Sequence, residues 1–396
     1  MSEPAGGDLL DAARTMRPTN LAEVRDAILD SAGPLLFRGH GTKLDWGNPP
    51  AEVAAVLDSG GLTDVLAYNA ADSTVAVQAG IPLALLQQVL SEHDQWLAID
   101  PPGVDDGVTV GGVFAAGDAG PSRLRYGTMR DLVIGATLVL SDGMIGRTGG
   151  FVIKNVAGYD MAKLLCGSLG TLAFVAELVL RVHPRPPASA TVCIPADAGA
   201  AARMSAALAA APVEPVAVDW AEQALWIRLT GHPDAVRAQT RRTPALLGAG
   251  DAETLEGDDE RAAWDRLIAA LHGVDGQTVV RAACLRTQLP EAIGALTTVA
   301  GEAGVDVDIS AHTLLGVMTA RLSGAGPAAH AKCVSGWRDA LRPLGGHAIV
   351  RRRIDGVDDQ VDIWGPPPPA IELMRRVKRE LDPGKRCAPG RFVGGI

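Results

Sequence analysis

The stretch Arg38-Gly39-His40-Gly41-Thr42 follows the apolar segment Pro34-Leu35-Leu36-Phe37 and decides how the rest of the chain is interpreted. The apolar segment is typical of a short strand. The glycines after it predict a tight turn whose backbone N–H groups point into open space. A turn of this kind binds phosphate oxygens, and Arg38 adds a positive charge. Alone, however, a glycine turn between a strand and a helix is usually only a turn.

Two later segments have the same character. They are Thr109-Val110-Gly111-Gly112 and Gly167-Ser168-Leu169-Gly170-Thr171. Together the three segments predict that loops from distant parts of one domain hold one large anionic cofactor. The chain contains neither G-x-G-x-x-G nor G-x-x-x-x-G-K-[ST], and Leu44 stands where a third glycine would be. A dinucleotide-binding Rossmann fold and a P-loop NTPase are therefore not supported.

Composition excludes several classes of protein. The chain has 396 residues and a net charge of −10, from 36 basic and 46 acidic residues, so nucleic acid is not an expected partner. Its five cysteines are scattered and never spaced C-x-x-C, so we expect no metal site and no disulfide framework. Residues 1–11 lack an apolar signal core, and no apolar run is long enough to span a membrane. We expect a cytoplasmic protein that reaches the inner face of a membrane only through partner subunits.

The order of elements predicts an α+β fold. A helix over 21–30, capped by Asn20, precedes the first glycine turn, and strands are expected over 74–79, 131–140 and 172–182. Helices are expected from 81 and over 161–166. The proline-rich run at 184–187 ends a first domain, 1–186. Residues 187–364 alternate alanine-rich helices with short strands, which predicts a second α+β domain. In the last segment, 365–396, a basic helix over 371–381 precedes a tail that we expect to dock.

The three glycine segments resemble, in this order, the flavin domain of the vanillyl-alcohol-oxidase type, also called the PCMH-type FAD-binding domain. Within this family the chain most closely resembles the FAD-binding E subunits of bacterial glycolate oxidases. The other segments that carry the resemblance are Pro101-Pro102, Arg123-Leu124-Arg125-Tyr126-Gly127, Lys154-Asn155-Val156-Ala157-Gly158-Tyr159-Asp160, Leu381-Asp382-Pro383 and Pro389-Gly390-Arg391-Phe392.

The resemblance implies two α+β subdomains with FAD between them, then a cap domain, and a C-terminal segment that returns to the FAD domain. It implies that the first glycine loop holds the pyrophosphate, the second lies beside it and the third completes the site. The implied cofactor-binding residues are Arg38, Gly39, His40, Gly41, Thr42, Pro101, Thr109, Gly111, Gly112, Gly167, Gly170, Thr171 and Val175.

Two positions bear on how the cofactor is held. Some relatives attach FAD covalently through a histidine at the position of Thr42, so the resemblance predicts non-covalent FAD here. His40 is offset from that position. It either contacts the cofactor or is an ordinary loop residue. Near the end of the chain, Ala388 replaces the asparagine of the family's Asn-Pro-Gly pattern, which puts a catalytic contribution from the tail in doubt.

Catalytic residues are harder to assign. Oxidising a 2-hydroxy acid needs a cation for the carboxylate and a base for the hydroxyl proton. Related catalytic subunits carry a metal-binding H-x-G-D-G-N motif, which this chain lacks. The weak candidates are Arg123, Arg125, Tyr126 and His347, and Lys154 is a further charged candidate. Arg123 and Arg125 are equally suited to a phosphate or a partner subunit, and we expect His312 to be a packed, hydrogen-bonded residue.

Three readings of function stay open. The first is an FAD-binding redox subunit of a glycolate or D-lactate oxidising complex. The resemblance implies that its partners are a paralogous FAD-containing catalytic subunit and an iron–sulfur subunit, and that electrons pass to quinone. The second is a self-sufficient FAD-dependent dehydrogenase of 2-hydroxy acids or alcohols. The third is a structural subunit whose flavin never turns over.

Overall fold

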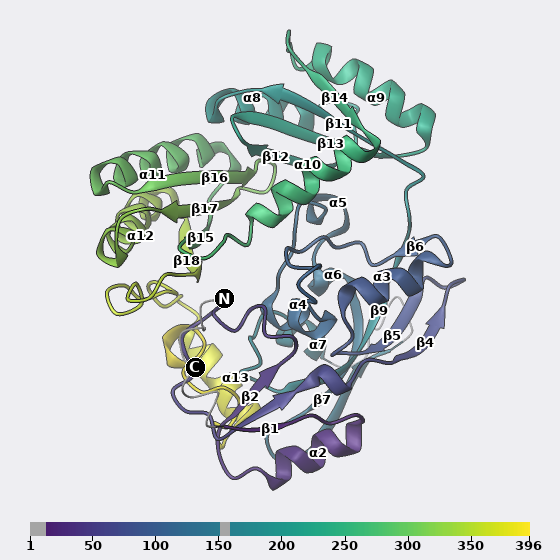
Figure 1. Cartoon of the computed structure of the whole chain (residues 1–396), viewed down its shortest axis with the longest axis vertical. Coiled ribbons are helices and arrows are strands. Elements are labelled where there is room, and N and C mark those ends of the chain that lie inside the picture. The colour runs from purple at the N-terminus through teal and green to yellow at the C-terminus, as the bar shows by residue number, and fades with distance from the viewer. Residues whose placement is uncertain (1–12, 151–158) are drawn as a thin grey trace. The chain divides into compact units, whose positions relative to one another are not determined.

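The computed structural model describes residues 13–150 and 159–396, and the chain divides into two compact units (Figure 1). The first unit contains the chain up to Ala119, Gly127–Arg185 and Pro366–Ile396, and the second contains Gly120–Tyr126 and Pro186–Gly365. Residues 120–126 fall inside the first domain expected from the sequence, but they pack with the second unit. In the described residues, no helix has the length and apolar character needed to cross a membrane.

The first unit is built from short elements. They are β1 (Arg14–Met16), α2 (Leu21–Asp30), β2 (Leu35–Arg38), β3 (Ala55–Asp58), β4 (Val65–Asn69), β5 (Thr74–Gln78), α3 (Leu83–Ser91), β6 (Gln95–Trp96), α4 (Val110–Ala116), α6 (Met129–Leu132), β7 (Val133–Val139), β8 (Ile145–Gly149), α7 (Met161–Leu165), β9 (Phe174–Arg181), β10 (His183–Pro184) and α13 (Ile371–Leu381).

Two sheets organise this unit. Strands β1, β3 and β2 form a small parallel sheet, and strands β4, β5, β9, β7 and β8 form an antiparallel sheet in that order. Helix α2 begins where the sequence predicts, because the Asn20 side chain accepts a hydrogen bond from the Glu23 N–H at 3.0 Å. Its buried residues Val24 and Ile28 belong to one apolar cluster with Leu35 and Phe174, which joins the two sheets.

Two local predictions need correction. The strand expected over 131–140 begins only at Val133, because α6 precedes it and Thr128 caps that helix with Asp131. The second glycine segment is not simply a loop, since Val110 to Ala116 form α4. Only glycine fits at position 111 of this helix, because an added Cβ would lie 2.7 Å from the Ala79 carbonyl oxygen.

The second unit has longer elements. They are α5 (Arg123–Tyr126), β11 (Ala188–Pro195), α8 (Ala198–Ala209), β12 (Pro215–Ala221), β13 (Ala224–Gly231), α9 (Pro233–Leu246), β14 (Glu253–Glu256), α10 (Gly257–Ala270), β15 (Thr278–Ala283), α11 (Leu289–Ala303), β16 (Asp306–His312), β17 (Val317–Ser323), α12 (Pro327–Leu341) and β18 (His347–Arg352).

An internal repeat, which the sequence does not establish, is plain in the topology. The eight strands form one sheet in the order β14-β11-β13-β12-β16-β17-β15-β18. Each half follows a β-α-β-β-α-β path, from β11 to β14 and from β15 to β18, and the halves meet where β12 pairs with β16. Figure 1 shows helices α8, α9, α10, α11 and α12 beside this sheet. Helices α8, α9, α11 and α12 contribute side chains to one large core, and α10 packs a separate apolar cluster around Trp264.

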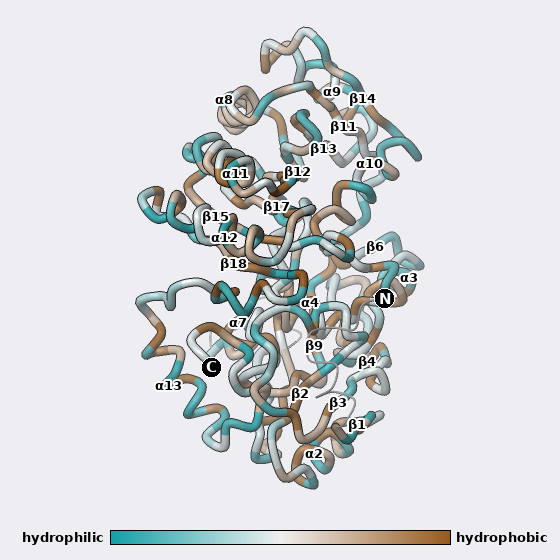
Figure 2. Tube along the Cα trace, turned by 60° about the vertical axis from the view of Figure 1, so that its left-hand side comes forward, coloured by the Kyte–Doolittle hydropathy of each residue, from teal (hydrophilic) through white to brown (hydrophobic). Residues whose placement is uncertain are grey.

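The C-terminal segment returns to the first unit. Hydrophilic and hydrophobic residues both occur along α13 (Figure 2), and its Val377 and Leu381 pack on the core of the five-stranded sheet. Beyond this helix, the Cys387 position pairs with Leu35 of β2, and the Ala388 N–H donates to the Leu35 carbonyl at 2.8 Å. The tail therefore packs beside the strand that leads into the first glycine loop.

Candidate functional site

The first glycine loop carries backbone donors that have no acceptor in the part of the chain that the structure describes. Gly41 has a φ of +86°, and the loop closes where the Leu44 N–H donates to the Gly41 carbonyl at 3.2 Å. Among the described residues, the N–H groups of His40, Gly41 and Thr42 donate to no protein acceptor. Consecutive unsatisfied donors around a left-handed glycine form an anion-binding nest, so this geometry suits a phosphate group.

Arg38 carries the positive charge noted from the sequence, and it also has a carboxylate partner. Its Nη2 lies 2.8 Å from Asp58 Oδ2, and the other oxygen of Asp58 accepts the Gly60 N–H at 2.8 Å. The carboxylate therefore partly neutralises the guanidinium and fixes its position. Arg38 still lines the pocket described below, and its remaining donors keep it a candidate ligand for an anion.

The second segment touches the first. A Cβ added at Gly39 would lie only 2.3 Å from Thr109 Oγ1, so only glycine permits this approach. Thr109 caps α4 by accepting the Gly112 N–H at 3.0 Å, and the Gly111 N–H donates to Ala79 at 2.7 Å. These two donors are already used within the protein. The second segment therefore contributes a closely packed glycine surface rather than free N–H groups.

The third segment is held against α4 and β2. The Gly167 N–H donates to Phe114 at 3.0 Å, and the Leu169 N–H donates to Ala115 at 2.8 Å. Gly170, with φ +74°, packs on the ring of Phe37, where an added Cβ would lie at 3.2 Å. All three glycine segments, far apart in the sequence, thus meet within the first unit.

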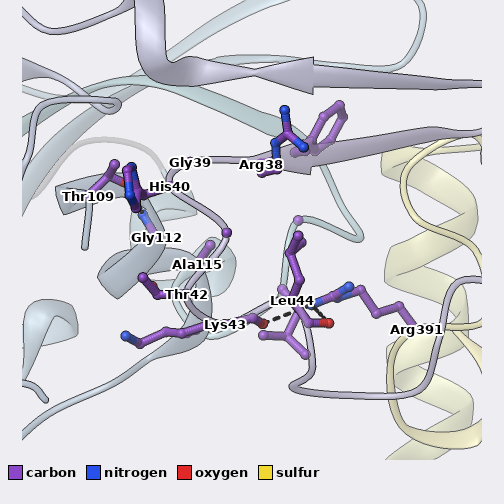
Figure 3. A pocket seen from close by; sticks show the side chains of 15 residues that line it. Arg38, Gly39, His40, Thr42, Lys43, Leu44, Thr109, Gly112, Ala115 and Arg391 are labelled. Carbon is purple, nitrogen blue, oxygen red and sulfur yellow. Dashed lines mark hydrogen bonds between the residues drawn. The ribbon is translucent and has the colours of Figure 1, made fainter. Parts of the chain in front are cut away.

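Two adjoining pockets lie where these segments meet, and Figure 3 shows the one that the first glycine loop lines. Their empty volumes are about 500 and 470 Å³, and they share part of their lining. Of the residues predicted from the sequence, the pockets bring together Arg38, Gly39, His40, Gly41, Thr42, Thr109, Gly111, Gly112, Gly170 and Val175.

Three predicted residues lie elsewhere in the first unit. Pro101 is buried and lines neither pocket. Gly167 and Thr171 line a separate apolar cavity with Leu373 and Phe392. Their contribution is to position the loop, because the Thr171 hydroxyl donates to the Ser168 carbonyl at 2.7 Å.

The sequence interpretation missed other lining residues, including Lys43 and Arg391 (Figure 3). Lys43 is buried, and its Nζ lies 3.3 Å from the buried Asp118 Oδ2 and 5.5 Å from the centre of the Trp46 ring. The pair ties the first loop to the end of α4. It is close enough for an ion pair, although the atoms are not aligned for a hydrogen bond. Lys43 directly follows the first glycine motif, and this position next to the motif is the sole feature of the sequence that could have pointed to it. Arg391 comes from the other end of the chain, so no local feature of the sequence connects it with the first loop.

The weak catalytic candidates all belong to the second unit. Arg123, Arg125 and Tyr126 form α5, which packs on β12, and Arg125 lies 3.5 Å from Glu214 in an exposed ion pair. His347 begins β18 and is exposed. Lys154, with the rest of segment 151–158, lies outside the described residues.

His312 occupies a buried position in the second unit. Its Nδ1 lies 2.7 Å from Asp219 Oδ1, across the junction of the two repeats. This contact is that of a packed, hydrogen-bonded residue. Within the described residues, no three histidine, cysteine or acidic side chains are grouped as metal ligands would be.

Comparison with known proteins adds independent information. A family model described as an FAD binding domain matches residues 12–149. The chain is 33% identical to glycolate oxidase subunit GlcE of Escherichia coli (strain K12) over 218 residues, which are 55% of this chain and 61% of that protein. It is 38% identical to a D-lactate dehydrogenase of Archaeoglobus fulgidus over 186 residues, which are 46% of this chain and 41% of that protein.

A solved structure shows the same fold over most of the chain. The alkyldihydroxyacetonephosphate synthase superposes with a TM-score of 0.68 at 17% identity, covering 96% of this chain and 77% of the synthase. At this identity the likeness shows the fold alone. The family model falls on the segment that carries the first two glycine loops, which agrees with a phosphate-binding nest in the same place. Residues 12–149 therefore carry an FAD-binding domain of the PCMH type, and its cofactor is FAD.

Proposed function

We propose that the chain is an FAD-binding redox subunit of a multi-subunit complex that oxidises 2-hydroxy acids such as glycolate or D-lactate. The observation that carries the proposal is the meeting of three glycine segments at one pocket in an FAD-binding domain. The names of the relatives, a glycolate oxidase subunit and a D-lactate dehydrogenase, support the substrate class. The subunit name also supports a complex, in which the proposed partners are a catalytic flavoprotein and an iron–sulfur subunit that passes electrons to quinone.

The residues around the pocket fit FAD. The pyrophosphate of FAD carries negative charge and needs several close N–H donors, and the N–H groups of His40, Gly41 and Thr42 are available for it. Gly39 and Gly112 remove the side-chain bulk that would fill the cradle next to Thr109. In this role Arg38 and the first loop hold the pyrophosphate, and the second and third segments enclose the cofactor. Bound FAD supplies the acceptor for the hydride that a 2-hydroxy acid gives up.

We propose that FAD is held without a covalent bond. Thr42 stands where some relatives have the attaching histidine, and its hydroxyl is not a suitable nucleophile without a base. The His40 ring packs 3.3 Å from the position of a Cβ at Gly107, which gives it a structural contact of its own. We expect acid precipitation to leave all the flavin in the supernatant. Flavin that stays with the protein pellet would show a covalent link.

The experiment that tests the function is anaerobic spectroscopy of the flavin. We expect the isolated chain to keep its oxidised band after addition of glycolate or D-lactate, because no group of metal ligands occurs in its described residues. The same chain, copurified with its partner subunits, is expected to bleach. Bleaching of the isolated chain would instead show a self-sufficient dehydrogenase. A band that persists even in the complex would show a flavin without a redox role.

A further inference from the structure

The C-terminal tail contacts the first glycine loop through a buried arginine. Arg391 is 4% exposed, and its Nη2 donates to the carbonyls of Lys43 and Leu44 at 3.1 and 3.0 Å (Figure 3). The backbone reinforces this contact, since the Asn48 N–H donates to the Arg391 carbonyl at 2.9 Å. The packing is tight: a Cβ added at Gly47 would lie 2.7 Å from that same carbonyl oxygen. The end of the first loop is therefore fastened to the tail.

The same tail also contacts the third glycine segment. Lys378 on α13 is buried, and its Nζ donates to the Thr171 carbonyl at 2.6 Å. The ammonium also donates to Asp382 Oδ2 at 2.7 Å and to the Cys387 carbonyl at 2.8 Å. Its charge is thus balanced within the tail. The contact reaches the carbonyl of the residue that closes the third segment.

These contacts connect two cofactor loops through one short piece of chain. We propose that two residues of this tail, Lys378 and Arg391, act as a strap that fixes the third and the first glycine segments in the conformation that binds FAD, with Arg391 as the positioning residue of the first loop. The proposal rests on the FAD site described under the proposed function. A loop without this anchor samples other conformations, and the cofactor must then order it on binding, which weakens affinity.

Arg391 differs from an ordinary structural residue in the groups to which it donates hydrogen bonds. Both acceptors are carbonyls at the end of the phosphate-binding loop, and Arg391 itself lines the pocket. Arg386 offers a matched comparison in the same tail. Its guanidinium donates to the carbonyls of Gly33, Ile28, Ser31 and Ser141, none of which lines the pocket. Loss of Arg386 should therefore reduce stability without acting directly on the loop.

The test measures the dissociation constant of FAD for the deflavinated full-length chain by quenching of flavin fluorescence, beside the melting temperature of the apoprotein. For Arg391→Ala we expect an FAD dissociation constant at least about tenfold higher, with a changed visible circular dichroism of the bound flavin. Arg391→Lys should be intermediate, because a single ammonium replaces the planar fork. Arg386→Ala should lower the melting temperature while its folded fraction binds FAD like the wild type.

The proposal would be overturned if Arg391→Ala bound FAD with wild-type affinity. It would also be overturned if Arg386→Ala weakened FAD binding as much as Arg391→Ala does. If Arg391→Ala does not fold, wild-type FAD affinity of Arg391→Lys would overturn it. Gly41→Val separates these failures from failure of the site itself. If Gly41→Val binds FAD normally, the first loop is not the phosphate site. If the Arg391 variants bind FAD normally and Gly41→Val does not, the proposed FAD site is supported and the proposed role of the strap is wrong.

Discussion

Replacing Gly41 with valine is expected to abolish retention of FAD. Gly41 holds φ at +86°, a conformation that costs an L-residue about 1–2 kcal/mol and a β-branched residue more. The loop must then abandon the turn that presents the N–H groups of His40 and Thr42. We expect the purified variant to contain less than about a tenth of the wild-type flavin, since several hydrogen bonds to a charged group are lost together. The ratio of absorbance at 450 nm to that at 280 nm measures this directly.

Gly276 provides the matched control for this experiment. Its φ is +82°, and an added Cβ would meet nothing within 4 Å, so Gly276→Val imposes a similar backbone strain away from the pocket. We expect this variant to lose a similar amount of stability and to stay fully yellow. A Gly41→Val protein as yellow as the Gly276→Val protein would show that the first loop does not hold the phosphate.

The second large effect is expected at Asp382, which is fully buried with Lys378. Asp382→Asn leaves the ammonium of Lys378 buried without its counter-charge. Breaking a buried pair in this way typically costs about 3–5 kcal/mol of unfolding free energy. The change also weakens the contacts that Oδ1 and Oδ2 accept from the backbone N–H groups of Arg386 and Cys387, at 2.9 and 2.8 Å. Urea denaturation at neutral pH measures the loss.

The pH dependence of this effect has a definite sign. Burial by itself raises the pKa of Asp382, but hydrogen bonds from Lys378 and from the backbone of Cys387 and Arg386 outweigh it, so the pKa is lowered from its ordinary value of 3.8. A lowered pKa contributes stability above the ordinary value and loses it as the pH falls toward the folded-state pKa. The difference in stability between wild type and Asp382→Asn should therefore shrink below about pH 3.8.

Glu372, on the same helix, supplies the control for Asp382. It pairs with Arg375 at 2.6 Å, but the side chains are 74% and 43% exposed. Exposed pairs contribute little, so Glu372→Gln should change the unfolding free energy by less than about 1 kcal/mol. An equal effect of the two substitutions would contradict the view that the buried pair anchors the tail.

Local patterns in the sequence predicted the elements with strong periodicity or caps. The amphipathic helix over 371–381 and the Asn20-capped helix over 21–30 appear with the expected bounds. Elements stabilised mainly by tertiary packing were missed. The two glycines of helix α4 are typical of a loop in the sequence. In the structure the helix packs closely against Ala79, a contact that the local sequence does not reveal. The two β-α-β-β-α-β halves share a path rather than a residue pattern, which is why the repeat is visible only in the structure.

For the site, the sequence predicted which segments meet but not the side-chain partners. A glycine turn depends on the backbone conformation of a few neighbouring residues, so the three glycine segments could be found from the sequence. The pairing of Arg38 with Asp58 and the anchoring of the first loop by Arg391 depend on contacts between distant residues. The packing of residues 120–126 with the second unit is non-local in the same sense, because nothing in Arg123-Leu124-Arg125-Tyr126 says which core it joins.

Ala388 has a backbone conformation that is uncommon for alanine. Ala388 replaces the asparagine of Asn-Pro-Gly, and its φ is +40°, close to the left-handed region that asparagine tolerates better than alanine does. Its side chain is buried, and its N–H pairs with Leu35. Asparagine would meet this backbone requirement at a lower cost than alanine does.

We propose that the first unit holds FAD at the pocket where the three glycine segments meet. The measurement that tests it most directly is the flavin content of the purified wild-type chain after free flavin has been removed, determined from its visible absorbance and its protein concentration. We predict about one FAD per chain in the wild type and in Gly276→Val, and almost none in Gly41→Val. A colourless wild-type chain that takes up no added FAD would contradict it.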